Sequence, residues 1–141
     1  MIKIGFDLDG TLDKPALAVL ARALLSNPAV QLHVITGIFD EAGAWQGENA
    51  KYEKLERLGF VTLTPASASS LAGVITPPNV RIHFLHAVGP EFGLDYRLRD
   101  LGLRKAALTE KEGISVFFDD SKTYCDIMPA MNGGLTILQV R

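Results

Sequence analysis

The sequence predicts a three-layer α/β fold of the Rossmann-like kind, in which helices cover both faces of a parallel sheet. Short apolar runs rich in β-branched residues alternate along the chain with stretches whose apolar residues recur at helical spacing. Strands that alternate with helices form βαβ units and therefore a parallel sheet. In such sheets ligands bind beyond the carboxyl ends of the strands, so polar residues that follow the strands become the candidates for function.

Five segments are expected as strands of this sheet, because apolar residues run almost unbroken through each one and stop at small or polar residues. In chain order they are residues 2–6, 30–35, 80–85, 114–118 and 135–140. A further short strand is expected at 60–64, within a segment from 60 to 78 that otherwise has the composition of a loop. His33 lies inside a strand and is expected as a packed core residue.

Helices are expected between these strands, and each has a residue that ends it. The first covers residues 17–24 and stops near Asn27 and Pro28, because a residue that precedes proline disfavours the helical conformation. The others cover residues 48–58, 94–101 and 104–112, and they end at Gly59, Gly102 and Gly113.

Composition limits the classes of protein that remain. The chain has 141 residues, 48% of them apolar and 21% charged, as in an ordinary globular protein, and we expect one domain over residues 1–141. The formal net charge of −2 gives no strong signature of nucleic-acid binding or of an anionic membrane partner. A single cysteine, Cys125, excludes an internal disulfide, and no apolar run approaches the length of a membrane span, so a cytoplasmic location is expected.

Two pairs of acids follow predicted strands. Asp7 and Asp9 stand two residues apart after the first strand, and Asp119 and Asp120 follow the strand at 114–118. An Asp-Gly turn explains Asp9 alone, and helix capping explains only one acid of the second pair. Neighbouring carboxylates repel one another and need a cation or a shared proton. Because the set contains oxygen ligands and neither His nor Cys, it favours Mg²⁺, and all four acids are candidate metal residues.

A hydroxyl group and an ammonium group complete the candidate site. Thr36 and Gly37 follow the strand at 30–35, and Lys105 lies at the start of the helix at 104–112. Taken alone, Thr36 is equally well explained as a hydroxyl that merely ends a strand. Lys105, taken alone, is better explained as a solvated surface charge. Beside carboxylates and Mg²⁺, however, a hydroxyl donor and an ammonium are what the oxygens of a bound phosphoryl group need.

These motifs together resemble those of a known family. Asp-Leu-Asp-Gly-Thr at residues 7–11 resembles the first motif of the haloacid dehalogenase superfamily of phosphatases, and Val-Ile-Thr-Gly at 34–37 resembles its second. Lys105 fits the third motif, with Lys111 as a competitor, and Phe-Phe-Asp-Asp-Ser at 117–121 fits the fourth. The order and the spacing of the motifs agree along the whole chain.

The resemblance implies a Mg²⁺-dependent hydrolase, a phosphatase that acts on phosphate monoesters. Asp7 would attack phosphorus and become a phosphoaspartate, and Asp9 would act first as general acid and then as general base. The carboxylates of Asp7 and Asp119 and the backbone carbonyl of Asp9 would hold Mg²⁺, with Asp120 as an indirect or water-mediated partner of the metal. The phosphoryl oxygens would be bound by Thr36, Gly37 and Lys105.

The departure from the family concerns its cap domains. Only a helix fits between residues 10 and 30, and the segment 37–104 must supply core elements, so we expect a small cap-less member with an open site. The segment 60–78 is a candidate for a partial lid. The expected partner is a phosphorylated substrate of unknown class, and its candidate contacts are Phe39, Trp45 and His86. Assembly into a homo-oligomer is left open.

Three alternatives to a phosphatase stay open. A phosphomutase would need a lid to exclude water. A non-catalytic module that binds Mg²⁺ and phosphate for protein interaction predicts the loss of Asp7 or Asp9, and both are present. A phospho-acceptor receiver domain would place its aspartate after a mid-chain strand, where this chain has Thr36.

Overall fold

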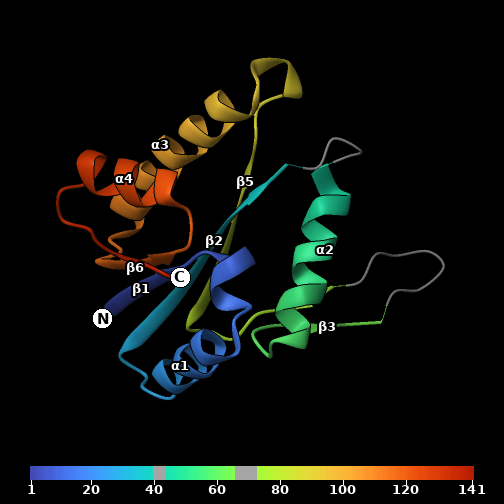
Figure 1. Cartoon of the computed structure of the whole chain (residues 1–141). Coiled ribbons are helices and arrows are strands. Elements are labelled where there is room, and N and C mark those ends of the chain that lie inside the picture. The colour runs from blue at the N-terminus through green and yellow to red at the C-terminus, as the bar shows by residue number, and fades with distance from the viewer. Residues whose placement is uncertain (40–43, 66–72) are drawn as a thin grey trace.

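A parallel sheet of five strands, in the order β5-β2-β1-β6-β7, forms the centre of the molecule (Figure 1). The computed structural model describes residues 1–39, 44–65 and 73–141, with side chains at all of these positions except 44–46. The predicted Rossmann-like α/β fold is confirmed. The strands are β1 (Ile2–Phe6), β2 (Val30–Ile38), β5 (Val80–His86), β6 (Val116–Asp119) and β7 (Thr136–Gln139).

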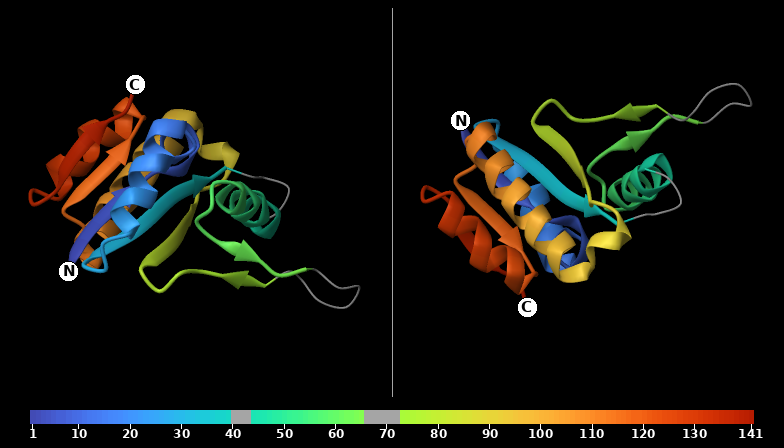
Figure 2. Two further views of the ribbon diagram at one scale, coloured as in Figure 1. Left: turned by 90° about the horizontal axis from the view of Figure 1, so that it is seen from below. Right: turned by 90° about the horizontal axis from the view of Figure 1, so that it is seen from above.

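Helices cover both faces of this sheet and make the fold three layers thick (Figure 2). α1 (Pro15–Leu25) and α2 (Ala44–Arg57) contribute residues to one hydrophobic cluster, whereas α3 (Leu94–Glu112) and α4 (Lys122–Met131) contribute to a second one. Within the described ranges, the structure contains no helix with the length and apolar character needed to cross a membrane.

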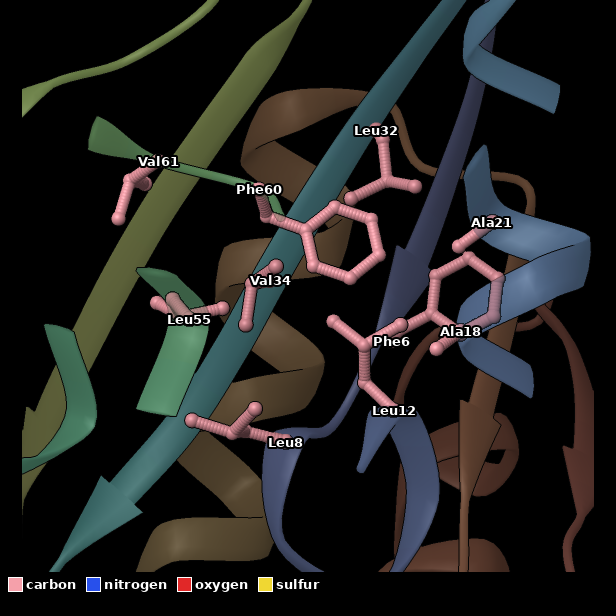
Figure 3. Close-up of a cluster of buried hydrophobic side chains, with 10 residues drawn as sticks. All are labelled: Phe6, Leu8, Leu12, Ala18, Ala21, Leu32, Val34, Leu55, Phe60 and Val61. Atoms are coloured by element: carbon pink, nitrogen blue, oxygen red, sulfur yellow. The ribbon is translucent and has the colours of Figure 1, made fainter. Parts of the chain in front are cut away.

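The first cluster holds α1 and α2 against the sheet. In Figure 3 the ring of Phe6 lies beside Ala18 and Ala21, whose small side chains allow α1 to approach the strand closely. Leu55 of α2 and Phe60, which follows that helix, are both 0% exposed in the same cluster. Burial of one such large side chain contributes about 1.5–3 kcal/mol, so these contacts fix the position of α2.

β2 is longer than predicted. Its pairing with β5 continues through Gly37 opposite Leu85 and Ile38 opposite His86. Thr36 and Gly37 therefore lie inside the strand, where the sequence predicted that they follow it. The extension depends on a neighbouring strand, and strand formation depends on such partners more than on local sequence.

α3 is one helix where the sequence predicted two. Gly102, which was expected to end the first of them, is buried within α3. A Cβ at this position would lie 3.2 Å from Ile127 Cδ1 and 3.3 Å from Tyr124 Cδ1, both on α4. The missing side chain of Gly102 thus permits close packing of the two helices. As a consequence, Lys105 lies in the middle of a long helix and not at the start of a short one.

A small antiparallel pair follows α2. It consists of β3 (Thr62–Leu63), which lies within the short strand predicted at 60–64, and β4 (Val74–Ile75), which was not predicted. The serines at 67–70, expected as loop, fall outside the described residues.

Candidate functional site

The order of the strands creates a switch point between β1 and β6. From β1 the chain adds β2 and β5 in one direction and then returns to add β6 and β7 on the other side. Connections that leave two neighbouring strands in opposite directions open a crevice at the carboxyl end of the sheet, where ligands bind. Asp7 directly follows β1 and Asp119 ends β6, and the backbone N–H of Asp7 donates to Phe118 O at 2.9 Å. Predicted acids therefore meet at this switch point.

Three of the four predicted acids form one cluster. One carboxylate oxygen from each of Asp7, Asp119 and Asp120 lies within 4.8 Å of the others. Asp7 and Asp119 are buried, and Asp120 is exposed. Gly10 makes room for Asp120, because its φ is +78° and a Cβ there would overlap the Asp120 carboxylate. The Asp-Gly turn thus reverses the chain and also leaves space for the Asp120 carboxylate.

Helix capping does not account for the second pair of acids. Ser121 is the N-cap of α4, and its Oγ accepts a hydrogen bond from the backbone N–H of Tyr124 at 3.4 Å. The Oδ1 atom of Asp119 accepts a hydrogen bond from the backbone N–H of Ser121 at 2.9 Å. That bond orients the Asp119 carboxylate so that its second oxygen faces the cluster.

Lys105 supplies a positive charge within the cluster. Its Nζ atom lies 3.2 Å from Asp7 Oδ1 and 3.0 Å from Asp119 Oδ2, and its side chain is 1% exposed. The ring centroid of Tyr124 is 4.2 Å from the same atom, a favourable cation–π distance. Lys111, the competing lysine, belongs to the last turn of α3. Of the two lysines that fit the third motif, Lys105 is therefore the one that the structure brings to the acids.

The charges of the buried cluster do not balance. Burial raises the pKa of both Asp7 and Asp119, and the Lys105 ammonium opposes the rise. Burial also disfavours the charged form of Lys105, but the two carboxylates outweigh this effect and raise its pKa. Three ionised carboxylates, including Asp120, and one ammonium carry a formal charge of −2. A divalent cation would neutralise this charge and relieve the cost of burying the carboxylates.

A cavity of about 500 Å³ opens beside these charges. The end of β2 forms one wall, which includes the buried residue Thr36, and α2 forms another. The described residues that line the cavity are Asp7, Asp9, Thr36, Gly37, Ile38, Phe39, Gly47, Ala50, Lys51, Lys105 and Tyr124. A wall of the predicted open site is therefore supplied by α2.

Asp9 lies at the rim and faces two lysines of α2. Lys51 and Lys54 both donate hydrogen bonds to its carboxylate, and Lys54 also reaches Asp13 Oδ2 at 3.1 Å. Although partial burial acts in the opposite direction, these lysines lower the pKa of Asp9. Neither lysine was predicted as a site residue from the sequence. Their spacing of three residues places them on one face of a helix, but it does not indicate what that face contacts, so the sequence alone did not point to them.

The three candidate substrate contacts have different positions. Phe39 lines the cavity, and the guanidinium carbon of Arg97 lies 5.2 Å from its ring centroid. Trp45 is in the first turn of α2, and its side chain falls outside what the structure describes. His86 ends β5 with its Nε2 atom 3.7 Å from Glu48 Oε2, and it is not among the described residues of the cavity wall. Tyr124, which does line the cavity, was missed because an aromatic residue on a helix face also fits the core.

Among comparisons with known proteins, only those with solved structures gave a match. No protein-family model matches the chain, and no curated protein matches it. Among solved structures the chain is similar to a universal stress protein in complex with cAMP, with 9% sequence identity and a TM-score of 0.46. The similarity covers 99% of this chain and 96% of that one. At this identity and TM-score the neighbour's ligand is not transferred to the present chain.

The comparison corrects the family expected from the motifs. The solved structure to which the chain is similar is that of a universal stress protein. This finding contradicts the expected membership in the haloacid dehalogenase superfamily. The functions derived from that resemblance, a phosphatase or another hydrolase with a phosphoaspartate at Asp7, are contradicted with it, and we do not retain them. The physical reason is that the motifs are short. They specify a turn and a set of carboxylates after parallel strands, and this arrangement belongs to a sheet geometry wider than one family.

Proposed function

We propose that the cavity at the carboxyl end of β1 and β6 binds Mg²⁺ together with a phosphate group of a small ligand. The protein then acts as a binding protein for a phosphate-bearing compound. The observation that carries the proposal is the buried cluster of Asp7, Asp119 and Lys105, with the exposed Asp120 beside it. We keep the expected cytoplasmic location as part of the proposal, since the single cysteine, Cys125, is free.

The donor set supports Mg²⁺. All three clustered side chains, from Asp7, Asp119 and Asp120, offer carboxylate oxygens, which are the ligands that this hard cation prefers. Bound Mg²⁺ would supply positive charge to carboxylates and phosphate oxygens alike. This supply is needed because burial disfavours the ionised forms of Asp7 and Asp119 and Lys105 offsets only part of the cost.

The cavity lining supports a phosphate group next to the cation. Thr36, which is 1% exposed, and Lys105 both line the cavity. A hydroxyl and an ammonium both donate hydrogen bonds to phosphate oxygens, and bonds that involve a charged group are the stronger ones. Gly37, which has no side chain of its own, lines the same cavity.

Calorimetric titration with methylphosphonate tests the proposal, because its P–C bond resists hydrolysis and leaves binding alone to be measured. We expect saturable binding with Mg²⁺ and none with excess EDTA. Asp119→Asn should weaken binding at least tenfold, since it removes charge from the metal ligands. Asp126→Asn is the matched control, because Asp126 is an exposed carboxylate paired with Lys122 on the surface of α4.

Two results would overturn the binding role. One is binding that persists unchanged in EDTA or in Asp119→Asn. The other is Mg²⁺-dependent release of phosphate from p-nitrophenyl phosphate that disappears in Asp7→Asn, because catalytic turnover at that carboxylate is outside the proposed role.

A further inference from the structure

The rim of the cavity holds a second, self-balanced group of charges. Asp9 and Asp13 face Lys51 and Lys54, so two carboxylates meet two ammonium groups. Asp9 accepts hydrogen bonds from both lysines, and Lys54 is shared with Asp13. Each acid therefore keeps a lysine partner if Lys51 turns away.

Lys51 differs from Lys54 in its position relative to the cavity. Lys51 lines the cavity that also contains Lys105 and Thr36, whereas Lys54 is not among the lining residues that the structure describes. The side chain of Lys51 is 19% exposed, and its hydrogen-bond partner Asp9 is 46% exposed. An ion pair of this exposure contributes little net stability, so exchanging Asp9 for an anionic group of a ligand costs little.

We infer that Lys51 is a specificity-determining residue that binds a second anionic group of the ligand, and that the ligand class is a diphosphate. This inference rests on the proposed function, in which the first phosphate lies beside Thr36 and Lys105. The second phosphate accepts a hydrogen bond from Lys51, and Asp9 retains Lys54. Leu55 of α2 is 0% exposed and packs in the hydrophobic core, which holds the helix that carries Lys51 in place.

Two probes that differ by one phosphonate group test the inference. Methylphosphonate and methylenediphosphonate both resist hydrolysis, and their affinities are measured by calorimetry in saturating Mg²⁺. We expect wild type to bind the diphosphonate at least tenfold more tightly. Lys51→Gln should lower the diphosphonate affinity about tenfold, as expected for one charge-assisted hydrogen bond, and the methylphosphonate affinity less than threefold.

Matched variants separate the role of Lys51 from general charge. Lys122→Gln removes an exposed lysine of α4 that pairs with Asp126 and is not among the described residues of the cavity wall, so it should change neither affinity by more than about twofold. Lys51→Arg keeps the charge and should keep the preference for the diphosphonate. Thermal unfolding of each variant establishes that α2 is still folded.

The outcomes are distinguishable. An equal loss for both probes in Lys51→Gln, or no loss for either, overturns the inference and leaves the proposed function intact. An equal effect of Lys122→Gln overturns the special position of Lys51. If wild type binds neither probe in the presence of Mg²⁺, the proposed function fails and this inference fails with it.

Discussion

The molecule contains two acid–lysine clusters whose first acids stand two positions apart in the sequence but differ in burial. Asp7 belongs to the inner cluster, where Lys105 is almost completely buried. Asp9 belongs to the rim cluster, where Lys51 and Lys54 remain partly exposed. In the inner cluster the effect of burial exceeds the opposing effect of the Lys105 ammonium, so the pKa of Asp7 is raised. At the rim burial is again the largest single influence, but hydrogen bonds from two lysines outweigh it and the pKa of Asp9 is lowered.

The difference in burial and charge balance determines what each cluster can bind. The inner cluster has more negative than positive charge and is buried, so it gains from an added cation. The rim cluster is balanced and partly hydrated, so its pairs can be exchanged at small cost. The same residue types therefore give two kinds of site. The buried inner cluster suits a cation and phosphate, and the partly hydrated rim cluster suits an exchangeable anion.

The largest expected effect comes from Lys105→Met, which would leave the inner carboxylates without their ammonium. Removing one partner of a buried ion pair costs about 3–5 kcal/mol, and we expect a loss of this size in the free energy of unfolding measured with urea at pH 7. Lys122→Met is the control, since Lys122 is 79% exposed and should change stability by less than about 0.5 kcal/mol. A loss below about 1 kcal/mol for Lys105→Met would contradict the described burial.

A buried group without a counter-ion sharpens the comparison. His33 is 0% exposed, as predicted for a core residue, and its Nδ1 atom lies 3.0 Å from His83 Nε2 while its Nε2 atom lies 2.8 Å from Gln31 Oε1. Burial, with a smaller contribution from His83, lowers the pKa of His33 to about 4 from 6.5. Lys3 and Arg81 contribute to this lowering of the pKa, and Glu112 opposes it.

The pH dependence of stability follows from this depressed pKa. Between pH 6.5 and 4 the unfolded chain takes up a proton that the folded chain does not. The contribution of His33 to the free energy of unfolding should therefore fall as the pH falls through this window, by at most about 1.4 kcal/mol per pH unit. Urea titrations of wild type and His33→Gln across the window measure the effect as the difference between the two slopes. Equal slopes would exclude His33 as the source.

Gly10→Ala tests how the inner cluster is shaped. The variant places a side chain at φ +78° and against the Asp120 carboxylate. We expect a loss of about 1–2 kcal/mol in stability from the left-handed conformation and a roughly tenfold weaker affinity for Mg²⁺, because Asp120 must move. Gly59→Ala controls for the strain alone, since Gly59 has φ +86° and its Cβ would meet only Arg22 Cδ, at 3.9 Å. Unchanged Mg²⁺ affinity in Gly10→Ala would remove Asp120 from the cation site.

The smallest expected effect is that of Lys54→Gln at the rim. Lys54 is 30% exposed and Asp9 is 46% exposed, so the loss should stay below about 1 kcal/mol. Chemical denaturation beside Lys105→Met gives both values under one condition. If the rim variant lost as much as the inner one, burial would not be what distinguishes the two clusters.

The fold was largely predictable because its signals are local. The apolar run of β1 matched the described strand, and the other strands of the sheet were found with shifted ends. Gly102 was wrongly predicted to end a helix. The sequence does not distinguish a glycine that ends a helix from one whose missing side chain lets α4 pack closely. The end of β2 was misread because Gly37 and Ile38 are held by pairing with β5, a contact distant in sequence.

The candidate site was predictable only in part. Asp7, Asp119 and Asp120 could be placed together because parallel strands end at the same edge of a sheet. Lys51 and Tyr124 could not be found, because their roles depend on how α2 and α4 lie over that edge. The family drawn from the motifs was wrong, since a turn and its carboxylates describe a local geometry and not the ancestry of the chain.

Anomalous X-ray scattering from crystals grown with Mn²⁺ and methylphosphonate tests the central claim most directly, because Mn²⁺ accepts the same oxygen ligands as Mg²⁺ and its position can be located. The account predicts an anomalous peak between the carboxylates of Asp7, Asp119 and Asp120, with the phosphonate between this peak and the side chains of Thr36 and Lys105. A saturated crystal in which Mn²⁺ binds elsewhere, or in which these three carboxylates hold no ion, would contradict it.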